Sequence, residues 1–285
     1  MWLALAFMSA FFAGVTSVLA KLGVKDMDSN LATALRTVVV FVFAWAMVFI
    51  TNAYTPLRDV EARNLLFLTL SGLATGVSWL CYFKALQLGG INKVVPVDKS
   101  SVVLTVLLAS ALLREGLGLY KLLCVALIGA GTYMMIEKKD VTEAEGKGWF
   151  IYAALSAVFA SLTAILGKTG VTGMDANLGT AVRTGVVLVM AWLVVFVRKG
   201  PRSVKHIGGG NWLFLVLSGC ATGASWICFY HALQAGPAGV VVPVDKLSIL
   251  VTVFCGAVIF KEKLKLKSLS GLALIVAGTI WMIFV

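Results

Sequence analysis

Six ionisable residues lie within strongly apolar stretches of this sequence, and they recur at matching positions in its two halves. They are Arg36, Arg183, Asp98, Lys99, Asp245 and Lys246. A charged side chain at the centre of a membrane helix costs about 2.5–3.5 kcal/mol on insertion scales, so such residues are functional candidates by default. Four cations face two acids, and this surplus of positive charge favours an anionic or zwitterionic substrate. The structural alternative is that Asp98 pairs with Lys99 or Arg36 and only fixes a helix end.

Both aspartates belong to the same motif, VVPVDK, in which a proline stands two positions before the acid. Proline removes a backbone donor and disfavours helix at the residue before it, which predicts a helix that begins near Pro96. Asp98 would lie in its first turn, where the helix dipole favours an anion. Asp98, Ser101 and Thr105 share one face at helical spacing, and we expect this face to line a cavity. The second motif repeats it as Asp245, Ser248 and Thr252.

Another polar stripe falls on one helix face and is also written twice. It consists of Ser71, Thr75, Ser78 and Tyr82, copied as Ser218, Thr222, Ser225 and Phe229. The adjacent stripe holds Gly72, Gly76, Gly219 and Gly223, whose spacing of four residues is typical of close helix packing. Trp79 and Trp226 lie too deep for an interfacial belt. We expect these tryptophans, with Ser78, Tyr82 and Ser225, to contact substrate.

Three residues are candidates for proton coupling: Asp98, Asp245 and His231. A histidine titrates near neutral pH, but His231 aligns with Lys84 near a span end, where snorkelling to the headgroups is the alternative. Glu115 and Glu262 are expected to be solvated helix caps, paired with Arg114 and Lys261. The five cysteines lie in apolar spans without metal-ligand spacing, so we predict neither a metal site nor a cofactor.

The composition is that of a membrane protein. Among 285 residues, 60% are hydrophobic and 13% are charged, whereas a soluble domain has about 25% charged residues. The apolar spans, each near the length that crosses a bilayer, are Trp2–Ala20, Leu31–Ile50, Leu65–Phe83, Val94–Leu113, Leu119–Ile136, Trp149–Gly167, Leu178–Val197, Trp212–Tyr230, Val240–Phe260 and Leu269–Val285. They predict an all-α polytopic protein with no enzymatic domain. The net charge of +11 is assigned to cytoplasmic loops and anionic lipid rather than to nucleic acid.

The chain consists of one sequence written twice. A fixed offset without gaps aligns Lys21 with Lys168, Arg36 with Arg183 and Asp98 with Asp245. We therefore divide the chain into a first five-helix repeat (1–138), a charged linker (139–148) and a second five-helix repeat (149–285). An odd number of spans per copy forces the second copy to insert upside down. Inverted-topology repeats are typical of secondary transporters that bind substrate between the repeats.

Loop charges predict the orientation of the chain in the membrane. The first copy is nearly balanced, but the second is strongly biased toward the linker side. That side carries Lys139, Lys147, Arg198, Lys199, Arg202, Lys205, Lys261, Lys263, Lys265 and Lys267, against Lys168 on the other. The positive-inside rule then places the linker in the cytoplasm and both termini outside.

Three stretches of the first copy carry a family resemblance: KLGVKDMDSNLATALRTVVV, SGLATGVSWLCYFKALQLG and KVVPVDKSSVVLTVLLASALLREGL. With their second copies, they resemble the EamA family of the drug/metabolite transporter superfamily, and in particular two fused five-helix units of the bacterial/archaeal transporter group. The resemblance implies ten helices in a prokaryotic cell membrane, around a central cavity walled by the first four helices of each half. It also implies carriage of small metabolites or drugs without ATP, although relatives usually have cytoplasmic termini.

We therefore interpret the chain as a secondary active transporter that works by alternating access. The expected partners are a small-molecule substrate and the lipid bilayer, with no nucleic acid, and the protein is expected to work as a monomer. Two alternatives remain: a flippase or exporter of an anionic lipid-linked group, and a non-transporting membrane subunit.

Overall fold

A computed structural model describes residues 1–23, 29–54, 59–88, 94, 97–135, 148–197, 209–259 and 266–285, and the regular structure in these ranges is helical. The first half contains α1 (Trp2–Gly23), α2 (Ser29–Ile50), α3 (Ala62–Leu88), α5 (Ser101–Leu113) and α6 (Leu119–Met135). The second contains α7 (Trp149–Val171), α8 (Ala176–Val197), α9 (Gly209–Ala235), α10 (Ala238–Asp245), α11 (Ser248–Ile259) and α12 (Leu266–Ile283).

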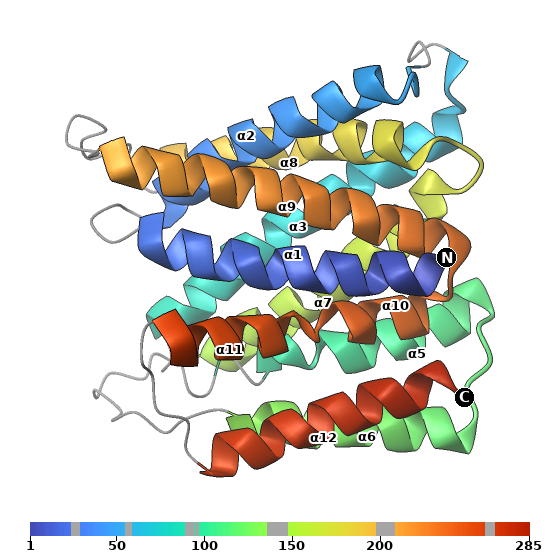
Figure 1. The fold of residues 1–285 in the computed structure, drawn as a ribbon. Helices are drawn as coiled ribbons and strands as arrows, with labels where there is room; N and C mark the ends of the chain where they lie inside the picture. Colours follow the sequence, from blue (N-terminus) through green and yellow to red (C-terminus); the bar gives the residue numbers. More distant parts are fainter. Residues whose placement is uncertain are drawn as a thin grey trace.

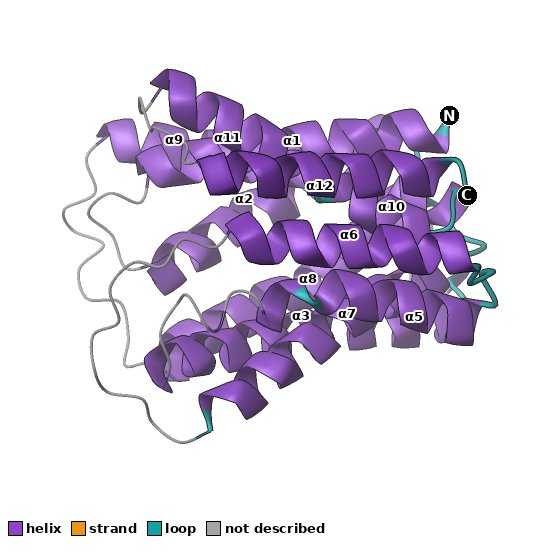
Figure 2. Cartoon of the chain, turned by 90° about the horizontal axis from the view of Figure 1, so that it is seen from below, coloured by secondary structure: helices purple, strands orange, loops and turns teal. Residues whose placement is uncertain are grey.

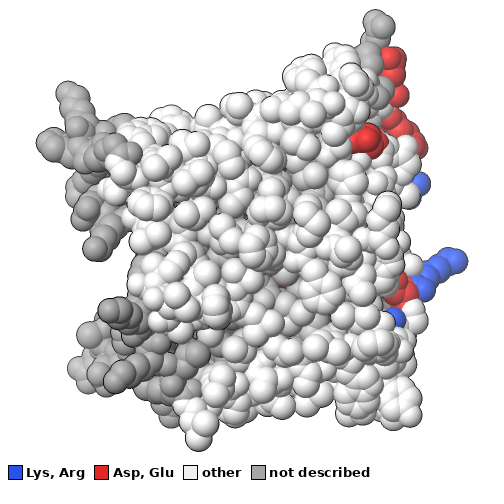
Figure 3. All heavy atoms as spheres, viewed as in Figure 1, with Lys and Arg blue, Asp and Glu red and all other residues white. Residues whose placement is uncertain are grey.

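The helices are those of an integral membrane protein. Eight described segments are long and apolar enough to cross a membrane, and α10 and α11 together form one of them. Helices suit this environment because every backbone donor and acceptor within them is satisfied without water. The face drawn in Figure 3 is free of charged side chains across its middle, and Lys, Arg, Asp and Glu gather at one end.

The span predicted over Val240–Phe260 corresponds to the candidate span Ala238–Ile259, but its helix does not begin near the proline as expected. The helix is interrupted at Lys246 and Leu247, between α10 and α11. Pro243 lies inside α10, where its missing N–H removes the bond that would reach the Gly239 oxygen. Beyond it the helix tightens: the amides of Lys246 and Leu247 bond three residues back, to the oxygens of Pro243 and Val244, both at 3.0 Å. Asp245 consequently ends α10, whereas the sequence placed it in a first helical turn.

In the first copy of the motif, too, the aspartate does not lie in the first turn of the long helix that follows. Asp98 lies in a short helical turn before α5, and Ser100 forms a turn between them. Pro96 lies outside the described residues. Both aspartates therefore stand where a helix is divided, which is where transporters place polar sites.

The two halves pack against each other in exchanged pairs. Helix α1 contacts α9 and α3 contacts α7, while α2 packs on α8 and α6 on α12. When the halves are exchanged, the first two of these contacts turn into each other and the last two map onto themselves, as in an isologous interface. Figures 1 and 2 place both chain ends at the same end of the bundle.

The glycine stripes bring helices of opposite halves into close contact. A Cβ added at Gly72 would lie 2.7 Å from Val186 Cβ and 3.2 Å from the Arg183 oxygen. One added at Gly219 would lie 2.6 Å from Val39 Cβ and 3.2 Å from the Arg36 oxygen. The packing interpretation of these glycines is therefore confirmed, because no larger residue fits between the backbones.

Candidate functional site

A cavity of about 330 Å³ lies between the two halves, lined by residues of α1, α3, α5, α7, α8, α9 and α10. Seven predicted site residues line it: Ser78, Trp79, Arg183, Ser225, Trp226, Asp245 and Lys246. Ser101 and Thr105 line it as well, but Asp98 of the same predicted face does not. In the second copy the reverse holds: Asp245 lines the cavity, and Ser248 and Thr252 do not. The cavity therefore combines aromatic and hydroxyl side chains with three charged groups.

Arg183 is the most enclosed charged group of the cavity, with only 3% of its surface exposed. It stands on α8, and α3 supplies its hydrogen-bond acceptors: Nε donates to Ser71 Oγ at 3.1 Å and Nη2 to Thr75 Oγ1 at 2.7 Å. Its guanidinium carbon lies 4.9 Å from the Trp226 ring centroid and 5.1 Å from that of Tyr230. Hydroxyls and aromatic faces thus fix its position without neutralising its charge.

The third nitrogen of this guanidinium is unsatisfied. Nη1 is buried and has no hydrogen-bond partner in the part of the chain that the structure describes. Within those residues, no carboxylate forms a salt bridge with Arg183. Leaving a buried cationic donor unpaired is costly, so this arrangement favours an anionic oxygen as its missing partner.

Each aspartate of the VVPVDK motifs is held by a serine from the opposite half. Ser9 Oγ donates to Asp245 Oδ1 at 2.7 Å, and the aligned Ser156 Oγ donates to Asp98 Oδ1 at 2.7 Å. A second serine completes each group: Ser225 donates to the Ser9 backbone oxygen and Ser78 to that of Ser156, both at 3.0 Å. These matched groups tie each divided helix to the first helix of the other half.

The two aspartates also share their surroundings with the two motif lysines. Lys99 lies within electrostatic reach of Lys246, Asp98 and Asp245. Two acids and two bases form a balanced set of charges. The positive charge of Arg183 remains outside this balance.

The other predicted residues lie away from the cavity lining. Arg36 is half-buried on α2, and Asp98 and the exposed Lys99 precede α5. Tyr82 packs with Ala85, Val94 and Trp149, and His231 Nδ1 lies 2.9 Å from the Ile227 backbone oxygen, one turn earlier on α9. The cavity is therefore asymmetric: it surrounds the arginine of the second half and not that of the first.

Sequence reasoning missed four residues of the site. Tyr230 and Thr163 line the cavity, Ser9 lines it while holding Asp245, and Ser156 holds Asp98. Ser9 and Ser156 align across the repeat, which was a usable signal. Tyr230 aligns with Phe83, so its hydroxyl is one of the few chemical differences between the halves.

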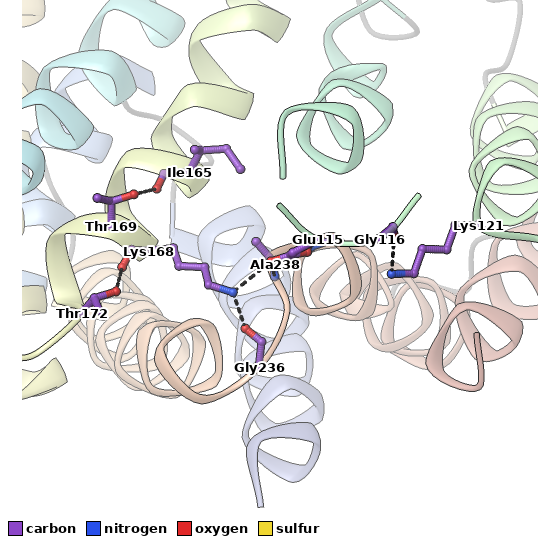
Figure 4. Close-up of polar contacts among 10 residues, drawn as sticks. Glu115, Gly116, Lys121, Ile165, Lys168, Thr169, Thr172, Gly236 and Ala238 are labelled. Carbon is purple, nitrogen blue, oxygen red and sulfur yellow. Dashed lines mark hydrogen bonds and ion pairs between the residues drawn. The ribbon is translucent and has the colours of Figure 1, made fainter. Parts of the chain in front are cut away.

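The expectation for Glu115 is also wrong. It is mostly buried rather than solvated, and it pairs with Lys168, not with Arg114 (Figure 4). The aligned Glu262 and the side chain of Lys21 lie outside the described residues.

Comparison with known proteins identifies the family. The model of the EamA-like transporter family matches residues 1–137 and again residues 147–284. The chain belongs to this family. A transporter encoded near cobO in a Sinorhizobium species, itself uncharacterized, is 43% identical over 134 residues, which are 47% of this chain and 95% of that protein.

Two further similarities extend the comparison. The uncharacterized transporter YxxF of Bacillus subtilis is 26% identical over 176 residues, covering 60% of this chain and 55% of YxxF. A solved crystal structure superposes with a TM-score of 0.79 at 18% identity and covers 98% of this EamA-like chain and 97% of that chain. At that identity, the superposition establishes the fold alone. The protein is thus a membrane transporter by family.

Proposed function

We propose that this protein is a secondary active transporter that moves a small solute with an anionic group, as a free anion or a zwitterion, by alternating access. The single observation that carries the proposal is the environment of the Arg183 side chain. Its guanidinium lines a cavity between the halves, is 3% exposed, and has an unsatisfied nitrogen. A carboxylate or phosphate oxygen would satisfy that nitrogen and compensate the charge.

Alternating access is supported by the exchanged helix pairs. In the proposed mechanism, the halves are inverted repeats, and the present arrangement has a counterpart in which their roles are reversed. Arg183 is engaged in one arrangement, and Arg36 would take the equivalent place in the other. Small rigid shifts along the paired helices would then carry the cavity from one membrane face to the other.

Asp245 is proposed as the proton-coupling residue of the arrangement described, with Asp98 as its counterpart. Asp245 lines the cavity and accepts a hydrogen bond from Ser9. Its carboxyl group is the proton acceptor that coupled transport would use. Ser78, Trp79, Trp226 and Lys246 would complete the contacts with substrate.

The decisive experiment measures ligand binding by the purified protein and uptake by proteoliposomes. A library of small carboxylates, phosphates, amines and neutral solutes is screened by thermal shift, with cations as the opposing class. We expect only solutes with an anionic group to stabilise the protein, and Arg183→Gln to abolish that stabilisation. Arg63→Gln is the matched control, because Arg63 is exposed and outside the cavity. Stabilisation by organic cations alone, or unchanged anion binding in Arg183→Gln, would contradict the proposal.

A second experiment addresses the arrangement in the membrane. Reporter fusions at Met1 and Val285 are expected to give matching signals, because both ends lie at one end of the bundle (Figure 2). The loop charges predict an external signal from each. Opposite signals would refute the ten-span topology, and matching cytoplasmic signals would refute the charge-based orientation alone.

A further inference from the structure

Glu115 lies just after α5, at the end of the bundle where the termini lie (Figure 1). There it joins the two halves of the chain (Figure 4). Its Oε1 accepts hydrogen bonds from Lys168 Nζ at 2.9 Å and from the Ala238 amide at 2.7 Å. Its Oε2 accepts a bond from the Gly239 amide at 2.8 Å. Lys168 also donates to the Gly236 oxygen at 2.7 Å. One carboxylate therefore connects the end of α5 with α7 and with the start of α10.

Glu115 supplies hydrogen-bond acceptors for the first amides of α10. The first four amides of a helix have no partner within it, and the residue before α10 is Pro237, which has no side-chain acceptor. The amides of Val240 and Val241 bond to the Pro237 oxygen at 3.1 and 2.9 Å. The remaining two amides, of Ala238 and Gly239, are those that Glu115 accepts. The cap of α10 thus comes from the other half of the chain, at the positive end of the helix dipole.

The backbone before Glu115 is specialised to make this contact. Arg114 ends α5 in the left-handed conformation, with φ 56° and ψ 30°. This conformation is unfavourable for a residue with a Cβ, because the Cβ approaches a carbonyl oxygen. The turn lets the Glu115 amide bond back to the Ala109 oxygen at 3.3 Å, and it directs the carboxylate toward α10. With side-chain exposures of 13% for Glu115 and 19% for Lys168, the ion pair is largely shielded from water.

The contact lies directly beyond the cavity. Ala164 lines the cavity and Lys168 stands four residues later on α7, while Val242 lines it and Ala238 stands four residues earlier on α10. Four residues are about one helical turn, or roughly 6 Å. The apolar cluster between the two levels includes Val106, Ala109 and Val241. The end of the cavity nearest the termini is therefore closed by packed side chains with the Glu115 contact outside them.

We propose that Glu115 is a gate residue, which holds this end of the cavity closed by capping α10 and pairing with Lys168. Building on the transport function proposed above, passage of solute through this end requires Glu115 to release both partners. The bonds that it breaks are charge-assisted, and water replaces them when the end opens. The state with Glu115 bound and the state with Glu115 released would be the two positions of the gate.

The test measures access to the cavity from the end that carries the termini. The five native cysteines are replaced, and Ser101→Cys is introduced, because Ser101 lines the cavity and is half-buried. A membrane-impermeant charged maleimide is then added to vesicles whose exposed face is established by a C-terminal tag. We expect Glu115→Ala to raise the labelling rate of Cys at this position about tenfold, since charge-assisted hydrogen bonds contribute about 1.5–3 kcal/mol each.

Two further variants make the result decisive. Lys168→Met keeps the cap and removes the ion pair, so it should raise the labelling rate by a smaller factor, and it serves as the second variant if Glu115→Ala does not fold. Lys121→Met is the matched control, because Lys121 lies at the same end and, among the described residues, donates only to the Gly116 oxygen, at 2.8 Å (Figure 4). An unchanged rate in both gate variants overturns the proposal, and so does an equal rise in Lys121→Met. Labelling needs no transported solute, so the anion proposal for Arg183 stands or fails separately.

Discussion

The two arginines that align across the repeat differ sharply in their environments. Arg183 is nearly fully buried and is held by Ser71 and Thr75. Arg36 is half-buried and does not line the cavity. Ser218 and Thr222 bond to Thr16 at 3.2 and 3.3 Å, just as the aligned Ser71 and Thr75 bond to Thr163 at 2.7 and 3.2 Å. Within the described residues, only Ser71 and Thr75 also accept hydrogen bonds from the arginine.

This difference arises although the residues that surround the two arginines are almost the same. The alternating access proposed above requires two nearly equivalent ways of packing the halves together, of which the protein adopts one at a time. The exception is Tyr230, which aligns with Phe83 and adds a hydroxyl beside Ser71. Two nearly identical halves can therefore bury one arginine and leave the other partly exposed. We infer that the Tyr230 hydroxyl favours the arrangement in which Arg183 is the buried one.

The largest expected effect separates the two arginines. Arg183→Gln should weaken anion binding by about 10- to 100-fold, since it removes a charge-assisted bond worth roughly 1.5–3 kcal/mol. Arg36→Gln should impair transport but leave equilibrium binding to this arrangement within a few-fold of the parent. Isothermal titration with the best anion from the screen measures both, and equal losses in the two variants would contradict the asymmetry.

A second comparison separates the two aspartates. Asp245→Asn should abolish the stimulation of uptake by a pH gradient, because the amide cannot carry a proton, while exchange of labelled for unlabelled solute continues. Asp98→Asn should keep binding in the described arrangement, since Asp98 lies outside the cavity lining. Uptake by Asp245→Asn that still follows the pH gradient would exclude Asp245 as the coupling residue.

The Tyr230 hydroxyl allows a finer test. Tyr230→Phe makes the second half match the first at this position and removes a contact near Ser71 and Arg183. We expect anion affinity to fall about five- to tenfold, the equivalent of about 1 kcal/mol for a neutral hydrogen bond. Titration of this variant beside Phe229→Leu, a neighbouring ring without a hydroxyl, checks that the effect follows the hydroxyl and not the loss of aromatic packing.

The smallest effects should be equal in the two halves. Ser9→Ala and Ser156→Ala each remove one 2.7 Å hydrogen bond to an aspartate. Interhelical hydrogen bonds in membrane proteins contribute about 0.6 kcal/mol on average, so both variants should lower the midpoint of thermal unfolding slightly and to the same degree. A clear difference between them would show that the matched serine–aspartate groups are not energetically equivalent.

Much of the site followed from residue type and spacing. Ser78, Trp79, Trp226 and Asp245 line the cavity because a helical stripe keeps its direction once the helix forms. The interruption after Asp245 was not foreseen, although Pro243 signals it, because proline is compatible with either a helix start or a kink. Glu115 was misjudged because its partners, Lys168 and the start of α10, are distant in sequence.

The sequence by itself determined the membrane helices, the repeat and the residues available to a site, since hydropathy, periodicity and alignment are local or linear properties. Only the tertiary structure decided which copy of each residue is used. Ser71 and Thr75 accept hydrogen bonds from Arg183, and Glu115 caps a helix of the other half. These choices depend on how the halves slide and pack against each other, and two nearly identical sequences leave that open.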